Sequence, residues 1–402
     1  MEVPMDVVDG RTQVTNGDLY STKPGTLAGR YLRRFWQPLG RSQDVHVGRA
    51  YSRKIMSELV TVYRGENGRV HVVQSHCPHR ATLLSTGWVE GDTLRCHYHG
   101  WKYDETGQCV EQPGEDAGFA AKICLRTYPA QDYLGLVFAY LGEGEAPPIR
   151  RFPDFEQPGV VEVPALIEFW PCNLFNRIDN AGDPGHIAYT HKESLRRSTG
   201  FKLAPPNCSV EETAYGTRAF EQLPDGTTIY PSHFHMPNIN QVGARAQFKT
   251  ASGEMKFVTG ERLFFRVPVD DEHSVSYTVE HFPLETEDAS AYLATRSERQ
   301  DQRVAELRAH SEAILRNEST VEEADPTFTT QQMFWIEDYV VQVGQLPISD
   351  DREEHLGRTD AGIILIRKLW RRELQALADG RPLQNWTAPA GLNALGLTGG
   401  TR

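Results

Sequence analysis

The chain has 402 residues, of which 39% are hydrophobic and 24% are charged. This length suits roughly two or three domains with buried cores. Lys and Arg number 42, and Asp and Glu number 54, so the net charge is −12, which disfavours nucleic acid and an anionic membrane surface as partners. Met1 to Gly17 contains no basic segment followed by an apolar run, and the apolar stretches are too short to cross a bilayer, so we expect neither a signal peptide nor a membrane span.

The chain up to Pro153 is predicted to form one helix followed by a small β domain. Apolar residues recur at helical spacing over 27–36. From 38 to 146, short β-rich runs alternate with turns, and Glu66-Asn67-Gly68 between two such runs indicates a hairpin. Prolines at 147, 148 and 153 mark a boundary.

The rest of the chain mixes strands and helices, which predicts an α+β domain. Strands are expected at 161–170, 218–223, 245–249, 262–269 and 274–281, with a turn at 224–226. Helices are expected at 288–316, 330–343 and 360–378, with Asp360 as the N-cap of the last. Glycines beyond 380 indicate a loosely ordered tail. The predicted segments are therefore an N-terminal helical segment (1–37), an all-β domain (38–148), a mixed domain (149–380) and a C-terminal tail (381–402).

Two short Cys-His motifs lie in the β-rich segment, at 77–79 and 96–99. Cys77, His79, Cys96 and His99 in this order match a Rieske [2Fe–2S] centre, in which two Cys hold one iron and two His hold the other. The same ligand types also bind structural zinc, but zinc fingers usually place both Cys before both His. We therefore favour the iron–sulfur cluster and keep zinc as the alternative.

The remaining cysteines show no paired spacing; they are Cys109, Cys124, Cys172 and Cys208. Unpaired thiols are typical of a reducing compartment, so we expect a cytoplasmic protein.

A second group of metal-capable side chains lies at 179–191. His186 and His191 with a nearby carboxylate suggest a 2-His-1-carboxylate triad, the open-sided Fe(II) site of non-haem oxygenases. Five residues on a regular helix turn a side chain by about 140°, so a helix end or an irregular turn must bring the two imidazoles together. Pro184-Gly185 permits such a start, and Asp183 could be the N-cap of a helix that begins there.

With these motifs, the chain over roughly 27–375 resembles the catalytic α subunit of Rieske non-haem iron aromatic oxygenases. It is most similar to the branch of phthalate dioxygenase and the vanillate and dehydrodivanillate O-demethylases. The resemblance implies a small all-β Rieske domain followed by a helix-grip (START-like) catalytic domain, in which covering helices pack on an antiparallel sheet. It also implies that His186, His191 and Asp338 bind a mononuclear Fe(II), with adjacent Glu337 as the alternative to Asp338. In many relatives a Glu-Asn pair stands where this chain has Asp179-Asn180.

The resemblance further implies how electrons reach the iron. A separate reductase of the flavin or ferredoxin type delivers NAD(P)H electrons to the cluster, and the cluster passes them to the iron, which activates O₂. The chain is expected to form a homotrimer or stacked trimers. Asp183 is expected to link His186 to His99 of a neighbouring subunit.

The substrate implied by the resemblance is a small aromatic acid or a methoxylated aromatic. O-demethylation or monooxygenation and ring cis-dihydroxylation of the phthalate type share the same iron ligands, so both reactions stay open. The pocket is expected from 200–265 and the helix at 330–345, with His233, His235, Asn238, Arg245 and Arg262 as candidate substrate contacts. A Rieske electron-transfer protein without oxygenase activity is the alternative from a different class, although it would need only about 150 residues.

Overall fold

The computed structural model describes residues 7–8, 11–116, 118–164, 168–199, 208–222, 228–250, 252–297, 303–349 and 352–392. The chain divides into two compact units. The smaller unit comprises Thr22–Arg150 and Val267–Asp270, and the larger unit comprises Met1–Ser21, Arg151–Arg266 and Asp271–Arg402. The domain limits inferred from the sequence stay predictions.

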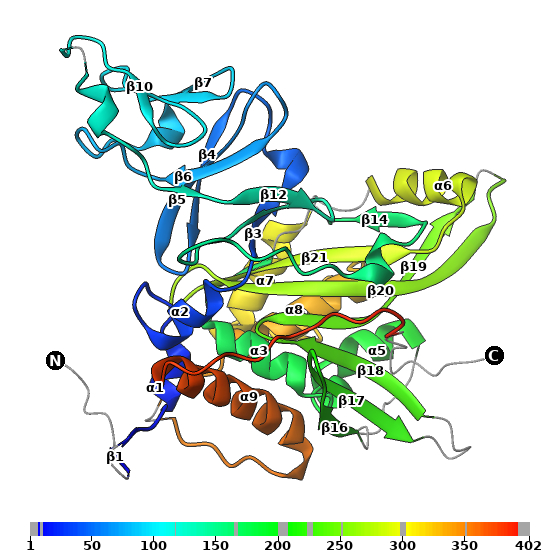
Figure 1. The fold of residues 1–402 in the computed structure, drawn as a ribbon. Coiled ribbons are helices and arrows are strands. Elements are labelled where there is room, and N and C mark those ends of the chain that lie inside the picture. Colours follow the sequence, from blue (N-terminus) through cyan, green and yellow to red (C-terminus); the bar gives the residue numbers. More distant parts are fainter. Residues whose placement is uncertain are drawn as a thin grey trace. The chain divides into compact units, whose positions relative to one another are not determined.

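The smaller unit is built from short antiparallel strands (Figure 1). Its sheets have the orders β11-β6-β5-β4, β10-β9-β8-β7 and β12-β13-β3. The strands are β3 (Gln37–Arg41), β4 (Ala50–Ile55), β5 (Glu58–Arg64), β6 (Val70–Gln74), β7 (Trp88–Glu90), β8 (Thr93–Arg95), β9 (Lys102–Tyr103), β10 (Cys109–Glu111), β11 (Thr127–Tyr128), β12 (Ala130–Tyr133) and β13 (Leu136–Ala139). The unit also contains helix α2 (Leu27–Leu32) and the 3₁₀ turns η1 (Ser42–Asp44), η2 (Leu84–Thr86) and η3 (Ala120–Lys122).

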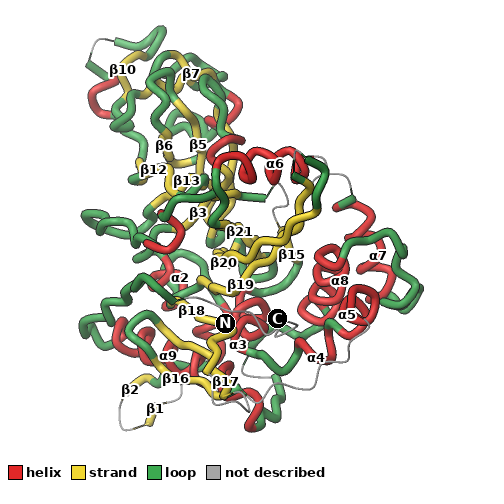
Figure 2. Tube along the Cα trace, turned by 90° about the vertical axis from the view of Figure 1, so that its right-hand side faces the viewer, coloured by secondary structure: helices red, strands yellow, loops and turns green. Residues whose placement is uncertain are grey.

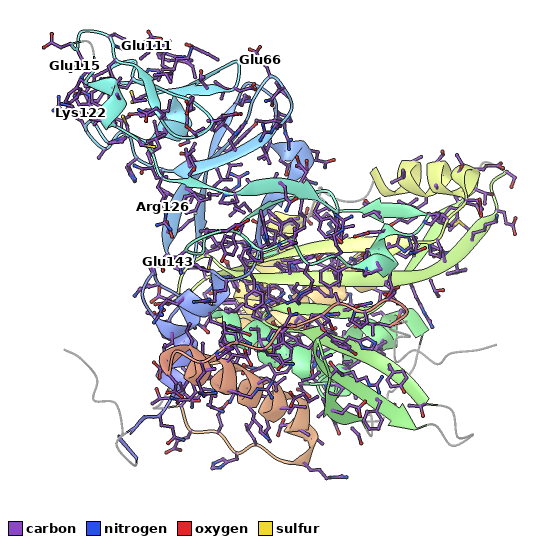
Figure 3. All side chains as sticks on the ribbon, viewed as in Figure 1. Glu66, Glu111, Glu115, Lys122, Arg126 and Glu143 are labelled. Carbon is purple, nitrogen blue, oxygen red and sulfur yellow. The ribbon has the colours of Figure 1, made fainter. Side chains whose placement is uncertain are left out.

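The hairpin expected around Glu66-Asn67-Gly68 is confirmed, because β5 pairs antiparallel with β6 across it. Val60 and Val62 of β5 and Val72 of β6 are at most 1% exposed, so one apolar core holds the sheet. Charged side chains cover the outside of the unit (Figure 3). The labelled examples, all exposed, are Glu66, Glu111, Glu115, Lys122, Arg126 and Glu143.

The larger unit is an antiparallel sheet of order β14-β21-β20-β19-β18-β17-β16, with β15 also paired to β21. The strands are β14 (Val160–Glu162), β15 (Glu168–Trp170), β16 (Ser209–Glu212), β17 (Gly216–Gln222), β18 (Thr228–His235), β19 (Ile239–Lys249), β20 (Met255–Pro268) and β21 (Ser274–Phe282). Near the N-terminus, β1 (Val7–Val8) pairs with β2 (Arg11–Thr12).

Helices pack against this sheet (Figures 1 and 2). They are α1 (Asn16–Tyr20), α3 (Leu174–Gly182), α4 (Ile187–Thr190), α5 (Lys192–Thr199), α6 (Thr286–Ser297), α7 (Val304–Leu315), α8 (Thr330–Val343) and α9 (Ala361–Ala378), with 3₁₀ turns η4 (Pro153–Glu156) and η5 (Arg358–Asp360). Asn173 caps α3 by accepting from the Phe175 N–H, and Thr329 with Gln332 forms a capping box on α8. α3 packs against both α8 and α9.

The expected α+β fold class, a small all-β unit followed by helices on an antiparallel sheet, is confirmed. Several element limits were wrong. The single helix expected at 288–316 is two helices, α6 and α7, because α6 packs on β19 whereas α7 packs on α8. The strand expected at 161–170 is two strands that pair with different parts of β21. The turn expected at 224–226 lies outside the described residues.

The predictions for the C-terminal elements also needed correction. Asp360 precedes α9 as predicted, but its carboxylate accepts from the Gly357 N–H at 2.6 Å and does not cap the helix. The tail is held in place up to 392, because Trp386 is only 5% exposed and Asp154 accepts from the N–H groups of Gly391 and Leu392. Among the described residues, none of the helices is both long and apolar enough to cross a membrane.

Candidate cluster and metal sites

The two Cys-His motifs of the smaller unit form loops with the same hydrogen-bond pattern. The Cys77 N–H donates to Thr82 and the Ala81 N–H donates back to Cys77, both at 2.9 Å. In the second loop, the Cys96 N–H donates to Trp101 at 2.8 Å and the Gly100 N–H donates to Cys96 at 3.1 Å. The fifth residue of each loop has positive φ, 57° at Ala81 and 74° at Gly100, which lets each chain turn tightly around its cysteine.

The four predicted cluster ligands differ in burial. Cys77 and Cys96 are 3% and 2% exposed, whereas His79 and His99 are half-buried with ring centroids 4.5 Å apart. Trp101 stacks on His79 at 4.3 Å, which fixes that imidazole. The loops therefore present two thiols on the inside and two imidazoles toward the surface.

A buried phenol contacts one of the two thiols. Tyr103 is 0% exposed, and its hydroxyl lies 3.0 Å from Cys77 Sγ. Burial, with Cys77 nearby, raises the pKa of Tyr103, so the phenol stays protonated and is able to donate to the sulfur of a cluster-bound Cys77. The sequence motifs do not include this residue. Its position four residues after His99 is the only signal that the sequence gives.

The metal-capable motif at 179–191 lies in the larger unit, where the chain breaks between helices α3 and α4. α3 ends at Gly182, and Asp183 Oδ1 accepts from the N–H groups of Gly185 and His186 at 2.8 and 3.3 Å. α4 is a four-residue helix between His186 and His191, which are its N-cap and C-cap. The irregular start expected from Pro184-Gly185 is thus present, and it is what brings two histidines five residues apart to one side.

His186, His191 and Asp338 converge. One ligand atom from each lies within 4.8 Å of the other two. Asp338 Oδ1 is 3.8 Å from Nε2 of His186 and 3.8 Å from Nε2 of His191. The His186 and Asp338 side chains are 17% and 28% exposed, so this group is open on one side.

Glu337, which the sequence left as an alternative to Asp338, has a different set of contacts. Its side chain is 1% exposed, and Oε2 lies 3.1 Å from Nδ1 of His191. Its other oxygen accepts from the backbone N–H groups of Glu193 and Ser194 at 3.1 and 2.9 Å. Neighbours on a helix point about 100° apart, so Glu337 reaches the far nitrogen of His191 while Asp338 faces both Nε2 atoms.

The far nitrogen of His186 is also occupied. Nδ1 of His186 donates to the backbone carbonyl of Asp183, while the Asp183 carboxylate lies 4.0 Å away. Both imidazoles therefore carry their proton on Nδ1 and leave the Nε2 lone pair facing Asp338.

Asn180 and Asp179, on the same helix, contact different partners. Asn180 Nδ2 donates to Asp338 Oδ1 at 3.2 Å. Asp179 instead forms an ion pair with Arg367 of α9, where Nε donates at 3.0 Å, and burial raises the pKa of this carboxyl. Asp179 therefore ties α3 to α9, and Asn180 positions the carboxylate beside the histidines.

The candidate pocket residues have mixed positions. Buried His233 bonds the Tyr215 hydroxyl at 2.8 Å, and burial lowers the pKa of His233 to about 4. Arg262 donates to buried Glu280 at 2.7 Å, and Arg245 is exposed. None of these contacts identifies a substrate, and the candidates stay predictions.

Comparisons with known proteins identify a domain over the segment that holds the two Cys-His motifs. Residues 35–129 match the model of the Rieske [2Fe–2S] domain. The chain is 28% identical, over 91% of its length and 81% of the relative, to the 5,5′-dehydrodivanillate O-demethylase oxygenase subunit of a Sphingobium species. It is 26% identical, over 88% of its length and 83% of the relative, to the phthalate 4,5-dioxygenase oxygenase subunit of Pseudomonas putida.

The fold agrees as well. The structure of dicamba monooxygenase matches with a TM-score of 0.59 and 16% sequence identity, over 87% of this chain and 99% of that one. A Rieske domain in the first third, together with similarity along most of the sequence, confirms the resemblance inferred from the motifs. The chain thus contains a Rieske [2Fe–2S] domain and is similar along most of its length to the oxygenase subunits named dehydrodivanillate O-demethylase and phthalate 4,5-dioxygenase.

Proposed function

We propose that this chain is a terminal oxygenase that uses O₂ and electrons from a partner reductase to oxidise a small aromatic acid or a methoxylated aromatic. The convergence of His186, His191 and Asp338, on the same chain as a Rieske domain, carries the proposal. A pure electron-transfer protein has no need for such a group.

The three side chains fit a mononuclear iron. Two atoms bound about 2.1 Å from one ion lie at most ~4.2 Å apart, and Asp338 Oδ1 is 3.8 Å from each Nε2. Two imidazoles and one carboxylate with an open side are the donor set of non-haem Fe(II) oxygenases. When bound, the metal supplies the activation of O₂.

The four loop residues fit a [2Fe–2S] cluster in the same way. Cys77 and Cys96 are buried, and His79 and His99 reach the surface, which matches a cluster with one iron held by Cys and the other by His. The half-buried His99 is the proposed exit for the electron.

The remaining residues orient these ligands. Glu337 and the Asp183 carbonyl hold the Nδ1 protons of His191 and His186, which raises the basicity of the opposite nitrogens. Asn180 holds Asp338. The Asp183 carboxylate lies 4.0 Å from its own histidine and is partly exposed, so it is free to accept from His99 of a neighbour in the proposed trimer.

The reaction is proposed from the relatives. Their names specify an O-demethylase and a 4,5-dioxygenase, and both activities use the same donor set, so O-demethylation or monooxygenation and ring hydroxylation remain the two candidate outcomes. The term oxygenase subunit implies a separate partner component, which we propose to be a reductase that takes electrons from NAD(P)H. All six cysteines are unpaired, which supports a cytoplasmic location.

The test uses the purified holoprotein with a surrogate reductase, ¹⁸O₂ and a panel of aromatic acids. We expect a reducible visible band and about three irons per chain, two of them in the cluster. Formaldehyde release identifies demethylation, and a cis-diol that contains labelled oxygen identifies dioxygenation. A colourless zinc protein, or the formation of neither formaldehyde nor a labelled ring product, would overturn the proposal.

A matched pair of variants sharpens this test. His186→Ala is expected to retain the cluster band, to hold about two irons and to form no product. His310→Ala on helix α7, where the imidazole contacts the Thr320 carbonyl, is expected to behave as wild type. Product formation by the His186 variant at the wild-type rate contradicts the assignment of the iron site.

A further inference from the structure

Two buried arginines of the larger unit share one carboxylate. Arg177 of α3 donates to Glu168 Oε2 at 2.7 Å, and Arg266 of β20 lies 3.7 Å from the same oxygen. Both guanidinium groups also donate to Ser276 Oγ, at 3.1 and 2.9 Å. Arg177 is 2% exposed and Arg266 is 6% exposed. These groups carry one positive charge in excess, in an interior where an unbalanced charge is costly.

The same region has more hydrogen-bond donors than acceptors. Nε of Arg177, Nε of Arg266 and Nε2 of Gln342 are buried, and so are the indole nitrogens of Trp170 and Trp335; none has a partner in the described part of the chain. These side chains are neighbours, because Arg177 donates to Gln342 at 2.7 Å and stacks over Trp170, whose ring meets that of Trp335. Buried donors without acceptors require oxygen atoms from water or from a ligand.

Arg266 lies on the face of the sheet that meets α3. Successive residues of a strand alternate between faces, so Arg262, Phe264 and Arg266 share one face of β20. Exposure falls along this row, because Arg262 and Phe264 are half-buried and Arg266 is buried. Arg266 stacks on the Phe264 ring at 4.7 Å. From the half-buried Arg262, this face of β20 therefore runs past the Phe264 ring to the buried guanidinium of Arg266.

The same face is coupled to the candidate iron site. Arg177, which meets Arg266 at Ser276, lies on α3 about one turn before Asn180, and Asn180 donates to Asp338. Arg266 and the candidate iron ligand Asp338 are thus linked through Ser276, Arg177 and the helix α3 that carries Asn180.

We propose that Arg266 binds the anionic group of the substrate and that Phe264 contacts the aromatic ring. This inference rests on the proposed oxygenase function and narrows its substrates to aromatic monoanions, such as carboxylates or sulfonates. One negative charge balances the excess, and its oxygens accept guanidinium N–H groups in charge-assisted hydrogen bonds. Arg262 is already paired with buried Glu280, so Arg266 is the cation that lacks a full counter-charge.

The balance of charge between Arg177 and Glu168 also predicts that the Arg266→Gln variant folds. Removal of Arg266 leaves Arg177 paired with Glu168 at 2.7 Å as a balanced pair, so the variant without ligand should be as stable as wild type in a thermal melt. A purely structural arginine would give the opposite result.

The test measures binding of benzoate, benzenesulfonate and neutral benzamide to the holoprotein by titration calorimetry, without O₂ or reductase. Wild type is expected to prefer the anions. Arg266→Gln should weaken binding of the anions by about 10- to 100-fold and leave benzamide unchanged. Arg381→Gln, at an exposed arginine beyond α9 that is paired with Asp379, should change neither.

Equal binding of benzoate and benzamide by wild type would falsify the proposal, and so would anion binding that survives in a folded Arg266→Gln protein or that falls equally in Arg381→Gln. If Arg266→Gln does not fold, Arg266→Lys and the wild-type preference for anions carry the same decision. Binding is measured without turnover, so it is independent of the reaction. An enzyme that holds iron and forms product but does not prefer anions to benzamide therefore rejects this inference and leaves the oxygenase function intact.

Discussion

At the scale of single residues, the Nδ1 atoms of His186 and His191 matter as much as the Nε2 atoms that face Asp338. Glu337 is almost fully buried and shares its oxygens between His191 and two backbone N–H groups. A buried carboxylate in this position fixes both the tautomer and the ring orientation of a metal ligand. Glu337 therefore preorganises His191, and the proposed ligand set of His186, His191 and Asp338 keeps its open side.

We expect Glu337→Gln to weaken iron binding at the second site by about 10- to 100-fold, because an amide cannot accept through both oxygens. The measurement is iron retained during dialysis against a graded chelator, with the cluster band as an internal standard. Glu312→Gln on α7 serves as the control. Iron retention equal to wild type would show that Glu337 does not position His191.

Tyr103 is expected to tune the cluster. A hydrogen bond to a ligand sulfur stabilises the reduced, more negative cluster, so Tyr103→Phe should lower its midpoint potential by roughly 20 to 60 mV, the equivalent of one ordinary hydrogen bond in a one-electron couple. Tyr63→Phe is the matched control, because Tyr63 lies in the same core but its hydroxyl donates to the Asp92 carbonyl. A potentiometric titration that gives the same shift in both variants would refute a specific role for Tyr103.

At the scale of elements, the crossing of α3 and α9 sets where the iron motif begins. A Cβ added at Gly362 would lie 2.1 Å from the Gly182 carbonyl oxygen, and Gly182 directly precedes Asp183. The close approach of the two helices therefore depends on glycine at this crossing.

Gly362→Ala is expected to destabilise the larger unit by about 1–3 kcal/mol through overpacking and to lower iron content at the second site, because α3 must move away. Gly357→Ala is the control, since a Cβ at Gly357 would lie no nearer than 3.7 Å to Asp360 Oδ2, an ordinary contact. Calorimetric melts and iron analysis test the pair. A Gly362 variant that melts and binds iron like wild type contradicts this account of the crossing.

The sequence indicated the candidate ligands, of which His186, His191 and Asp338 converge in the structure, but not the residues that contact them. The spacing of His186 and His191 required a break in the helix, and α4 shows one. Glu337 and Asp338 are adjacent carboxylates, so only the rotation of α8 separates their contacts. Arg266 was missed because strand alternation cannot reveal which face of a sheet meets the helices. The tail was expected to be loose because glycine content says nothing about the buried contact of Trp386.

At the scale of the whole molecule, the two predicted redox sites lie in different compact units of one chain. The half-buried His99 and the partly exposed Asp183 each have a surface-facing side. A head-to-tail ring would let every cluster serve the iron of the next subunit, which is a heterologous, closed interface. The proposed trimer therefore predicts electron transfer between subunits, whereas a route within one chain does not.

Co-expression of two inactive variants tests this route. Cys96→Ser removes a cluster ligand and Asp338→Ala removes an iron ligand, so each variant alone should form no product. Differently tagged subunits allow trimers that contain both variants to be purified. In a head-to-tail ring of either mixed composition, roughly one interface in three joins an intact cluster to an intact iron, so the purified mixed trimers should regain about one third of wild-type turnover. If these trimers are as inactive as either parent, the electron stays within one chain; activity near this fraction requires transfer between subunits.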